Sequence, residues 1–117
     1  MAISKKVQDQ IVQYQQLEGQ IEALFMQKSQ ISSQISEVRS AMETLGDASD
    51  DAAVYEAAGN ILVKREGKTE MSADLESRLE LLDVKLKAVE KQEEALRTRY
   101  TALQKEISDA LTTMQAG

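Results

Sequence analysis

The sequence predicts a mainly α-helical fold: a long antiparallel two-helix coiled coil with a β-hairpin between the helices that pairs with hairpins of other subunits. Two observations support this prediction. Each half of the 117-residue chain carries a heptad-spaced apolar stripe, and between the stripes lies VYEAAGNILVKR, a run of strand and turn residues. Aromatic residues make up only 3% of the chain, so a compact core of large rings is not expected. We expect one domain over residues 1–117.

The first helix is predicted over about residues 4–46. This stretch has no Pro, and Gly19 is its one glycine before Gly46, which we expect to close the helix as a C′ residue. We call the core-facing heptad positions the seam, and all of them here except Gln10 and Lys28 are apolar. The seam of this helix consists of Val7, Gln10, Tyr14, Leu17, Ile21, Leu24, Lys28, Ile31, Ile35, Val38, Met42 and Leu45.

The second helix is predicted over about residues 72–115. Ser72 is expected to cap it, and Asp74 and Glu76 suit the positive end of the helix dipole. Its seam is apolar at every position but Glu93, and a stripe of this length is typical of a coiled coil. The seam consists of Leu75, Leu79, Leu82, Leu86, Val89, Glu93, Leu96, Tyr100, Leu103, Ile107, Ala110 and Met114.

The charged interruption of each seam suggests how the helices pair. If the second helix folds back so that Val7 faces Met114, Lys28 comes to face Glu93. We interpret them as a partly solvated coiled-coil register pair, because polar seam groups specify register at some cost in stability. The alternative, a catalytic lysine and acid, is disfavoured because two paired helices offer no cleft to enclose them.

Residues 47–71 are predicted to form a loop and a β-hairpin. A two-stranded hairpin alone in water is marginally stable, and the rest of the chain is predicted to be helical. We therefore expect it to pair with hairpins of other chains, burying Ile61 and Val63. The predicted oligomerisation hairpin consists of the strand formers Val54, Tyr55, Ile61, Leu62 and Val63 and the turn pair Gly59 and Asn60.

In this order of elements the chain resembles the prefoldin β subunit of the archaeal type. The resemblance rests on VY and GNILVK of the hairpin and on EKQEE within LELLDVKLKAVEKQEEAL of the second helix. It implies a hetero-hexamer of two α-type and four β-type subunits, joined through their hairpins. The ends of the coiled coils would hold unfolded client proteins without ATP and pass them to a group II chaperonin. The family often has a Pro before VY, where this chain has DASDDAA, so we expect a looser loop.

Apolar residues near both chain ends suggest where clients bind. Three of them, Ile3, Ile11 and Leu111, lie outside the seam, and contiguous exposed apolar side chains usually form a contact surface. The alternative is that they pack on one another and complete the helix pair. We call the predicted client-binding tips the helix-end set: Ile3, Val7, Ile11, Ile107, Leu111 and Met114. A second off-seam pair is Phe25 and Met26.

Composition excludes several classes of function. The chain lacks His and Cys, which are common general bases, metal ligands and nucleophiles. A net charge of -6 disfavours binding to nucleic acid, and the sequence has neither a signal-like nor a membrane-length apolar run. Gly67-Lys68-Thr69 resembles the end of a phosphate loop, but Leu62 stands where that loop needs Gly. Asp47, Asp50 and Asp51 lack the spacing of a calcium loop.

We therefore expect a cytoplasmic protein that is not an enzyme and has no catalytic residue, metal or cofactor. The preferred function is an ATP-independent holdase subunit. The alternative is a structural scaffold or filament subunit in which the coiled coils are only spacers. Such a spacer would not need the apolar residues outside the seam.

Overall fold

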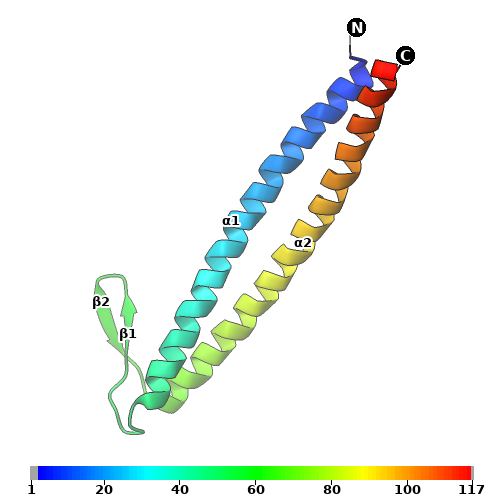
Figure 1. Cartoon of the computed structure of the whole chain (residues 1–117). Helices are drawn as coiled ribbons and strands as arrows, with labels where there is room; N and C mark the ends of the chain where they lie inside the picture. The colour runs from blue at the N-terminus through cyan, green and yellow to red at the C-terminus, as the bar shows by residue number, and fades with distance from the viewer. Residues whose placement is uncertain (1–2, 117) are drawn as a thin grey trace. The chain divides into compact units, whose positions relative to one another are not determined.

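The computed structural model describes residues 3–116 and the side chains as far as Met114. It contains two long helices, α1 (Lys5–Asp47) and α2 (Lys68–Ala116). Between them lie the strands β1 (Tyr55–Ala58) and β2 (Ile61–Lys64), which form an antiparallel hairpin (Figure 1). The predicted fold class, two long helices with a two-stranded hairpin between them, is confirmed.

The chain divides into two compact units. The terminal unit comprises the chain up to Ser29 and from Ala88 onward, and the hairpin unit comprises Gln30–Lys87. In each unit a stretch of α1 runs beside a stretch of α2 in the opposite direction (Figure 1). Every predicted seam position of both helices is buried or half-buried. The heptad pattern therefore identified the packed face of each helix.

α1 begins with a side-chain cap and ends differently from the prediction. The Ser4 hydroxyl accepts a hydrogen bond from the Val7 amide at 3.2 Å, as an N-cap residue does. At the other end the helix includes Gly46 and Asp47, and Gly46 does not have the positive φ of a C′ glycine. Instead, Lys68 Nζ donates to the carbonyl oxygens of Gly46, at 3.1 Å, and Ala48, at 2.8 Å.

α2 begins at Lys68, so Ser72 lies inside the helix and the prediction that it caps α2 is wrong. The carbonyl of Gly67 accepts the Met71 amide at 3.0 Å, which places the start of the helix directly after Gly67. Gly67 has φ +157, a value that L side chains rarely adopt. This glycine lets the chain turn from β2 into α2 without the longer link that the sequence suggested. Lys68 of the Gly-Lys-Thr sequence therefore serves to cap α1.

The hairpin pairs Tyr55 with Lys64 and Ala58 with Ile61. Gly59 in its two-residue turn has φ +63, whereas Asn60 is not among the described residues with positive φ, so the turn is of type II′. Val54 precedes β1, and its carbonyl accepts the Arg65 amide at 2.8 Å. This bond closes the base of the hairpin.

A small apolar core fastens the hairpin base to both helices of the hairpin unit. Val54, Met71 and Leu75 are buried in it, and three half-buried residues of α1 pack against them: Val38, Met42 and Leu45. Val54 was predicted as a strand residue and instead anchors the strand that follows it. Within residues 3–116, neither α1 nor α2 contains an apolar stretch of the length that a membrane span requires.

Candidate functional site

The hairpin exposes apolar side chains on both of its faces. Because residues of a strand alternate between faces, Tyr55 and Leu62 share one face while Ile61 and Val63 share the other. All four are exposed, from 43% for Val63 to 72% for Leu62. The chain leaves this apolar surface open to solvent, which is unusual for a monomer and typical of a contact surface.

The two edges of the hairpin lie in different surroundings. In the part of the chain that the structure describes, β1 and β2 pair only with each other. β1 borders a groove of about 730 Å³ that small residues of α1, among them Ser40, Ala41 and Thr44, line from the other side. No residue of β2 lines this groove. The edge of β2 is therefore the more open of the two.

The helix-end set is only partly exposed. Ile3 is 37% exposed, whereas Val7 is 5% exposed. Val7 is buried because it is also a seam position, so it is the least accessible member of the set with a stated exposed fraction. The remaining members are half-buried: Ile11, Ile107, Leu111 and Met114.

Three members of the helix-end set meet in a shallow groove of about 490 Å³. Ile11, Ile107 and Leu111 line it together with Tyr14. Polar groups complete its rim: Gln15, Glu18, Gln104 and Ser108. Apolar side chains that line an open groove are typical of a contact surface.

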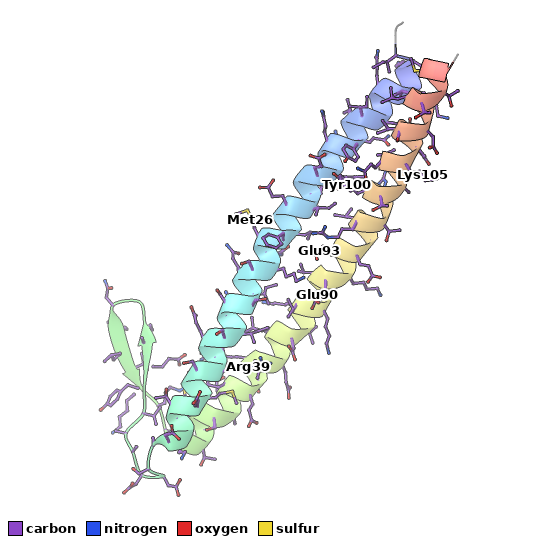
Figure 2. All side chains as sticks on the ribbon, in the orientation of Figure 1. Met26, Arg39, Glu90, Glu93, Tyr100 and Lys105 are labelled. Carbon is purple, nitrogen blue, oxygen red and sulfur yellow. The ribbon has the colours of Figure 1, made fainter. Side chains whose placement is uncertain are left out.

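Other exposed apolar residues of the terminal unit lie on α1. Val12, Phe25 and Met26 are exposed and outside the seam. Met26 projects from α1 on the side away from α2 (Figure 2). These residues contribute nothing to closing the helix pair.

The structure brings Lys28 and Glu93 together in the seam of the terminal unit. Lys28 Nζ lies 3.4 Å from Glu93 Oε1, and the side chains are 37% and 11% exposed, respectively. Glu93 Oε2 has Arg97 Nη2 at 3.8 Å, too far for a hydrogen bond. The pair is thus desolvated at the carboxylate and solvated at the ammonium. Its role in fixing the register stays a prediction.

A tyrosine pair nearby was not predicted. The rings of Tyr14 and Tyr100 stack with centroids 4.4 Å apart, and their hydroxyl oxygens lie 2.6 Å apart. Tyr100 Oη also donates to Glu18 Oε1 at 3.3 Å. The hydrogen bond with Tyr14, burial and the Glu18 carboxylate together raise the pKa of Tyr100 to about 12. Figure 2 shows Tyr100 and Glu93 between the two helices of this unit.

In the register that places Val7 opposite Met114, Tyr14 faces Ile107 and Tyr100 faces Ile21, which are both aliphatic. Such a register states which positions face each other and not how far a side chain reaches. The sequence nevertheless contains a feature that could have predicted the contact between the two tyrosines. Tyr14 and Tyr100 each place a hydroxyl in an otherwise largely aliphatic seam, and a buried hydroxyl usually finds a polar partner.

Comparison with known proteins agrees with these features. The sequence model of a family described as "Prefoldin subunit" matches residues 8–113. The prefoldin subunit beta of Methanosarcina acetivorans is 42% identical over 106 residues, covering 91% of this chain and 90% of the relative. That of Methanococcoides burtonii is 40% identical over 111 residues, covering 95% and 94%.

A solved structure shows the same fold. The crystal structure of the prefoldin beta subunit from Thermococcus strain KS-1 superposes with a TM-score of 0.86 at 30% identity, covering 94% of this chain and 96% of that one. The two long helices, the apolar hairpin between them and similarity over nearly the whole length all point to one assignment: the chain belongs to the family of prefoldin β subunits, which are chaperone subunits.

Proposed function

We propose that this chain is an ATP-independent holdase subunit that binds unfolded proteins through the helix-end set and, within a larger complex, delivers them to a group II chaperonin. The observation that carries the proposal is the presence of apolar side chains outside the seam of the terminal unit. Ile3, Phe25 and Met26 are exposed there, and Ile11 and Leu111 line an open groove. Such residues cost solubility and do nothing to close a coiled coil.

The chemistry of this surface suits clients without a fixed shape. Aliphatic side chains and Met form non-directional contacts, and Met adapts its shape to its neighbour. Several such ends in one complex would retain a client through individually weak contacts that each release quickly. Retention of this kind requires no bond making or breaking, so the proposal includes no catalytic residue and no cofactor.

Assembly would proceed through the exposed hairpins. Tyr55, Ile61, Leu62 and Val63 would be covered by hairpins of further copies and of an α-type prefoldin subunit. The family resemblance suggests two α-type and four β-type chains. We place the complex in the cytoplasm, where nascent and unfolded chains are present.

The holdase proposal is tested by the aggregation of a chemically unfolded client diluted into the assembled complex, followed by light scattering. The test variant replaces Ile3, Ile11 and Leu111 with Ser, which removes apolar surface but leaves Ser4 and the seam intact. A matched control replaces Leu81 and Val84, which are exposed on α2 in the hairpin unit, with Ser.

We expect the test variant to keep the mass of the complex and lose much of its suppression of aggregation, while the control retains both. A chain trimmed of residues 1–11 and 107–117 should lose suppression completely. If the trimmed complex keeps its mass and still suppresses aggregation, the helix-end set is not the client site. If the unaltered complex does not suppress aggregation, the scaffold alternative is preferred.

A further inference from the structure

A carboxylate of β1 is held between two guanidinium groups. Glu56 Oε2 accepts from Arg65 Nη1 at 2.5 Å, and Glu56 Oε1 accepts from Arg78 Nη2 at 2.5 Å. Arg65 follows β2, whereas Arg78 belongs to α2. Both oxygens of one strand residue are thus tied to groups outside the strand, in the strongest class of hydrogen bond that side chains form.

The same arginines are fixed from the other side by α2. Asp74 Oδ2 accepts from Arg78 Nη2 at 2.8 Å and from Arg65 Nη1 at 3.3 Å. Glu70 Oε1 accepts from Arg65 Nη2. The five side chains form one connected ionic cluster, and Arg65 within it is only 20% exposed. A network of this kind constrains geometry more than an isolated surface ion pair does.

The apolar core alone does not fix the direction of the hairpin. Val54 is buried at the base of the hairpin. A single buried residue attaches the hairpin to the helices but does not prevent it from pivoting about that residue. Beyond it, the large apolar side chains of β1 and β2 are exposed. Among the described residues, one polar side-chain contact connects a strand with a helix: Glu56 of β1 accepts a hydrogen bond from Arg78 of α2 and forms an ion pair with it. The contact of Glu56 with Arg78 attaches β1 to α2 at a second point, and two points of attachment restrict the direction of the hairpin.

We propose that the cluster of Glu56, Arg65, Glu70, Asp74 and Arg78 is a positioning clamp that sets the direction in which the hairpin leaves α2. Glu56 lies on the same face of the hairpin as Ile61 and Val63, so the clamp turns this face toward α2 and leaves the face of Tyr55 and Leu62 turned away. Val63, which pairs with Glu56, is 43% exposed, the lowest value of the four large apolar residues, whereas Leu62 is 72% exposed. Farther along the hairpin the two faces differ little, with Ile61 63% and Tyr55 56% exposed.

The clamp would matter for assembly, and this consequence rests on the proposed function. Neighbouring hairpins pair in a fixed geometry only if each chain presents its strand edge and apolar face in the same direction. A hairpin attached at Val54 alone would sample many directions and would pair more slowly and less specifically. The arginines and acids of the clamp are therefore positioning residues for the assembly surface and do not themselves contact a partner.

Acid and salt should release the clamp. Hydrogen bonds from Arg78 and Arg65 hold the pKa of the Glu56 carboxyl below its ordinary value. Because the folded-state pKa is depressed, the stabilisation is present above the unfolded pKa and is lost as pH falls through the folded value. The groups that face Glu56 are Arg65, Arg78 and, through them, Asp74 and Glu70. All are partly exposed, so concentrated salt should also weaken the cluster.

The clamp can be tested by measuring the direction of the hairpin in solution. The chain has no Cys, so nitroxide labels attach only to cysteines introduced at Ser33 of α1 and Asn60 of the turn, both within the hairpin unit. Double electron–electron resonance then gives the distribution of distances between the two labels. Labelled chain is diluted into an excess of unlabelled chain so that only distances within one chain are recorded.

We expect a narrow distribution of label distances for the parent and broad distributions for Glu56→Gln and for Arg78→Gln. Arg78→Lys should give an intermediate width, because lysine keeps the positive charge but lacks the planar set of N–H donors of arginine. Arg39→Gln, an exposed arginine of α1 outside the cluster, is the matched control and should leave the distribution narrow. Helix content by circular dichroism should be the same for all. If the distance distributions of Glu56→Gln and Arg78→Gln are as narrow as that of the parent, the cluster does not set the direction of the hairpin.

The same variants separate this inference from the proposed function. The label distance is measured without client or partner chain, so a chain that shows the expected broadening but forms no complex supports the clamp and contradicts the proposed assembly. In chains that do assemble, Glu56→Gln should reduce the yield of the full-mass complex relative to Arg39→Gln. An unchanged yield despite a broadened distribution would refute the role of the clamp in assembly.

Discussion

Two pairs of side chains with polar groups meet between the two seams. Lys28 lies against Glu93, and Tyr14 lies against Tyr100. The first pair could be predicted, because each seam has one charged interruption and the antiparallel register brings the two together. The second was not predicted, because the register that places Val7 opposite Met114 makes Ile107 the partner of Tyr14 and Ile21 the partner of Tyr100. Contact between long side chains depends on rotamers, which a heptad pattern does not specify.

Replacing Tyr14 with Phe should keep the stacked rings and remove one hydroxyl. Because the hydrogen bond with Tyr14 is the largest cause of the raised pKa of Tyr100, this pKa should fall from about 12 toward its ordinary value. A raised pKa means that the neutral phenol stabilises the fold below the unfolded pKa, and that this stabilisation is lost as pH rises through the folded value. The tyrosinate absorbance on titration with base measures the shift.

Tyr55→Phe is the control, because this tyrosine is exposed in the hairpin unit. It should leave the titration of Tyr100 unchanged. A Tyr14→Phe chain in which Tyr100 still titrates near 12 would show that burial and Glu18 are sufficient causes.

Replacing Glu93 with Lys should destabilise the terminal unit, since it places a second ammonium group beside Lys28 in the seam. We expect a loss of about 2 kcal/mol in the free energy of unfolding, less than for a fully buried pair because Lys28 is 37% exposed. The double change Lys28→Glu with Glu93→Lys should recover part of this loss. Recovery should be incomplete because Arg97 would then lie near the new ammonium group.

Urea denaturation of the parent, the single variant and the exchanged pair measures these differences. If the exchanged pair is no more stable than Glu93→Lys alone, the contact between the two positions does not stabilise the register.

At the scale of elements, helix faces were predictable and helix ends were not. Burial follows the heptad pattern along both helices, because apolar periodicity determines which face leaves water. The cap of α1 depends on a distant residue, because Lys68 lies 22 residues along the chain from Gly46, whose carbonyl it caps. At α2 the missed signal was local: Gly67 allows the helix to start before Ser72, so the serine predicted the wrong start.

The two glycines Gly59 and Gly46 should respond to alanine in opposite ways. Gly59 has φ +63, where a Cβ atom costs about 1–2 kcal/mol, so Gly59→Ala should speed amide hydrogen exchange in β1 and β2. Gly46 lies in α1 without positive φ and has no atom within 4 Å of an added Cβ. Gly46→Ala should therefore stabilise the chain by about 0.5–1 kcal/mol. A loss of stability at Gly46, measured by thermal unfolding, would favour the C′ cap that the sequence suggested.

At the scale of the whole molecule, the hairpin is the feature that a single chain leaves incomplete. Its two strands have no third partner among the described residues, and its apolar side chains are exposed on both faces. A free two-stranded sheet is marginally stable in water, so the proposed pairing with hairpins of further chains would also stabilise this chain. A net charge of -6 favours solubility of the chain.

Replacing Ile61 and Val63 with Asp should prevent assembly, because charged groups would be buried wherever hairpins meet. Light scattering coupled to size exclusion should then report the mass of a monomer or an irregular aggregate. Leu81→Asp with Val84→Asp, which introduces the same charge on an exposed part of α2, is the control and should leave the mass unchanged. An oligomer of normal mass in the hairpin variant would refute pairing through the hairpins.

The sequence by itself determined the two helices, their packed faces, the hairpin with its Gly-Asn turn and the contact between Lys28 and Glu93, since each follows from local periodicity or from one interruption per stripe. The tertiary structure alone decided the cap of α1 by Lys68, the anchoring of Val54, the tyrosine pair and the ionic cluster around Glu56. These features join residues far apart in the chain or depend on side-chain reach and direction. Heptad spacing records which face of a helix packs, but it carries no information about how a side chain is oriented within that face.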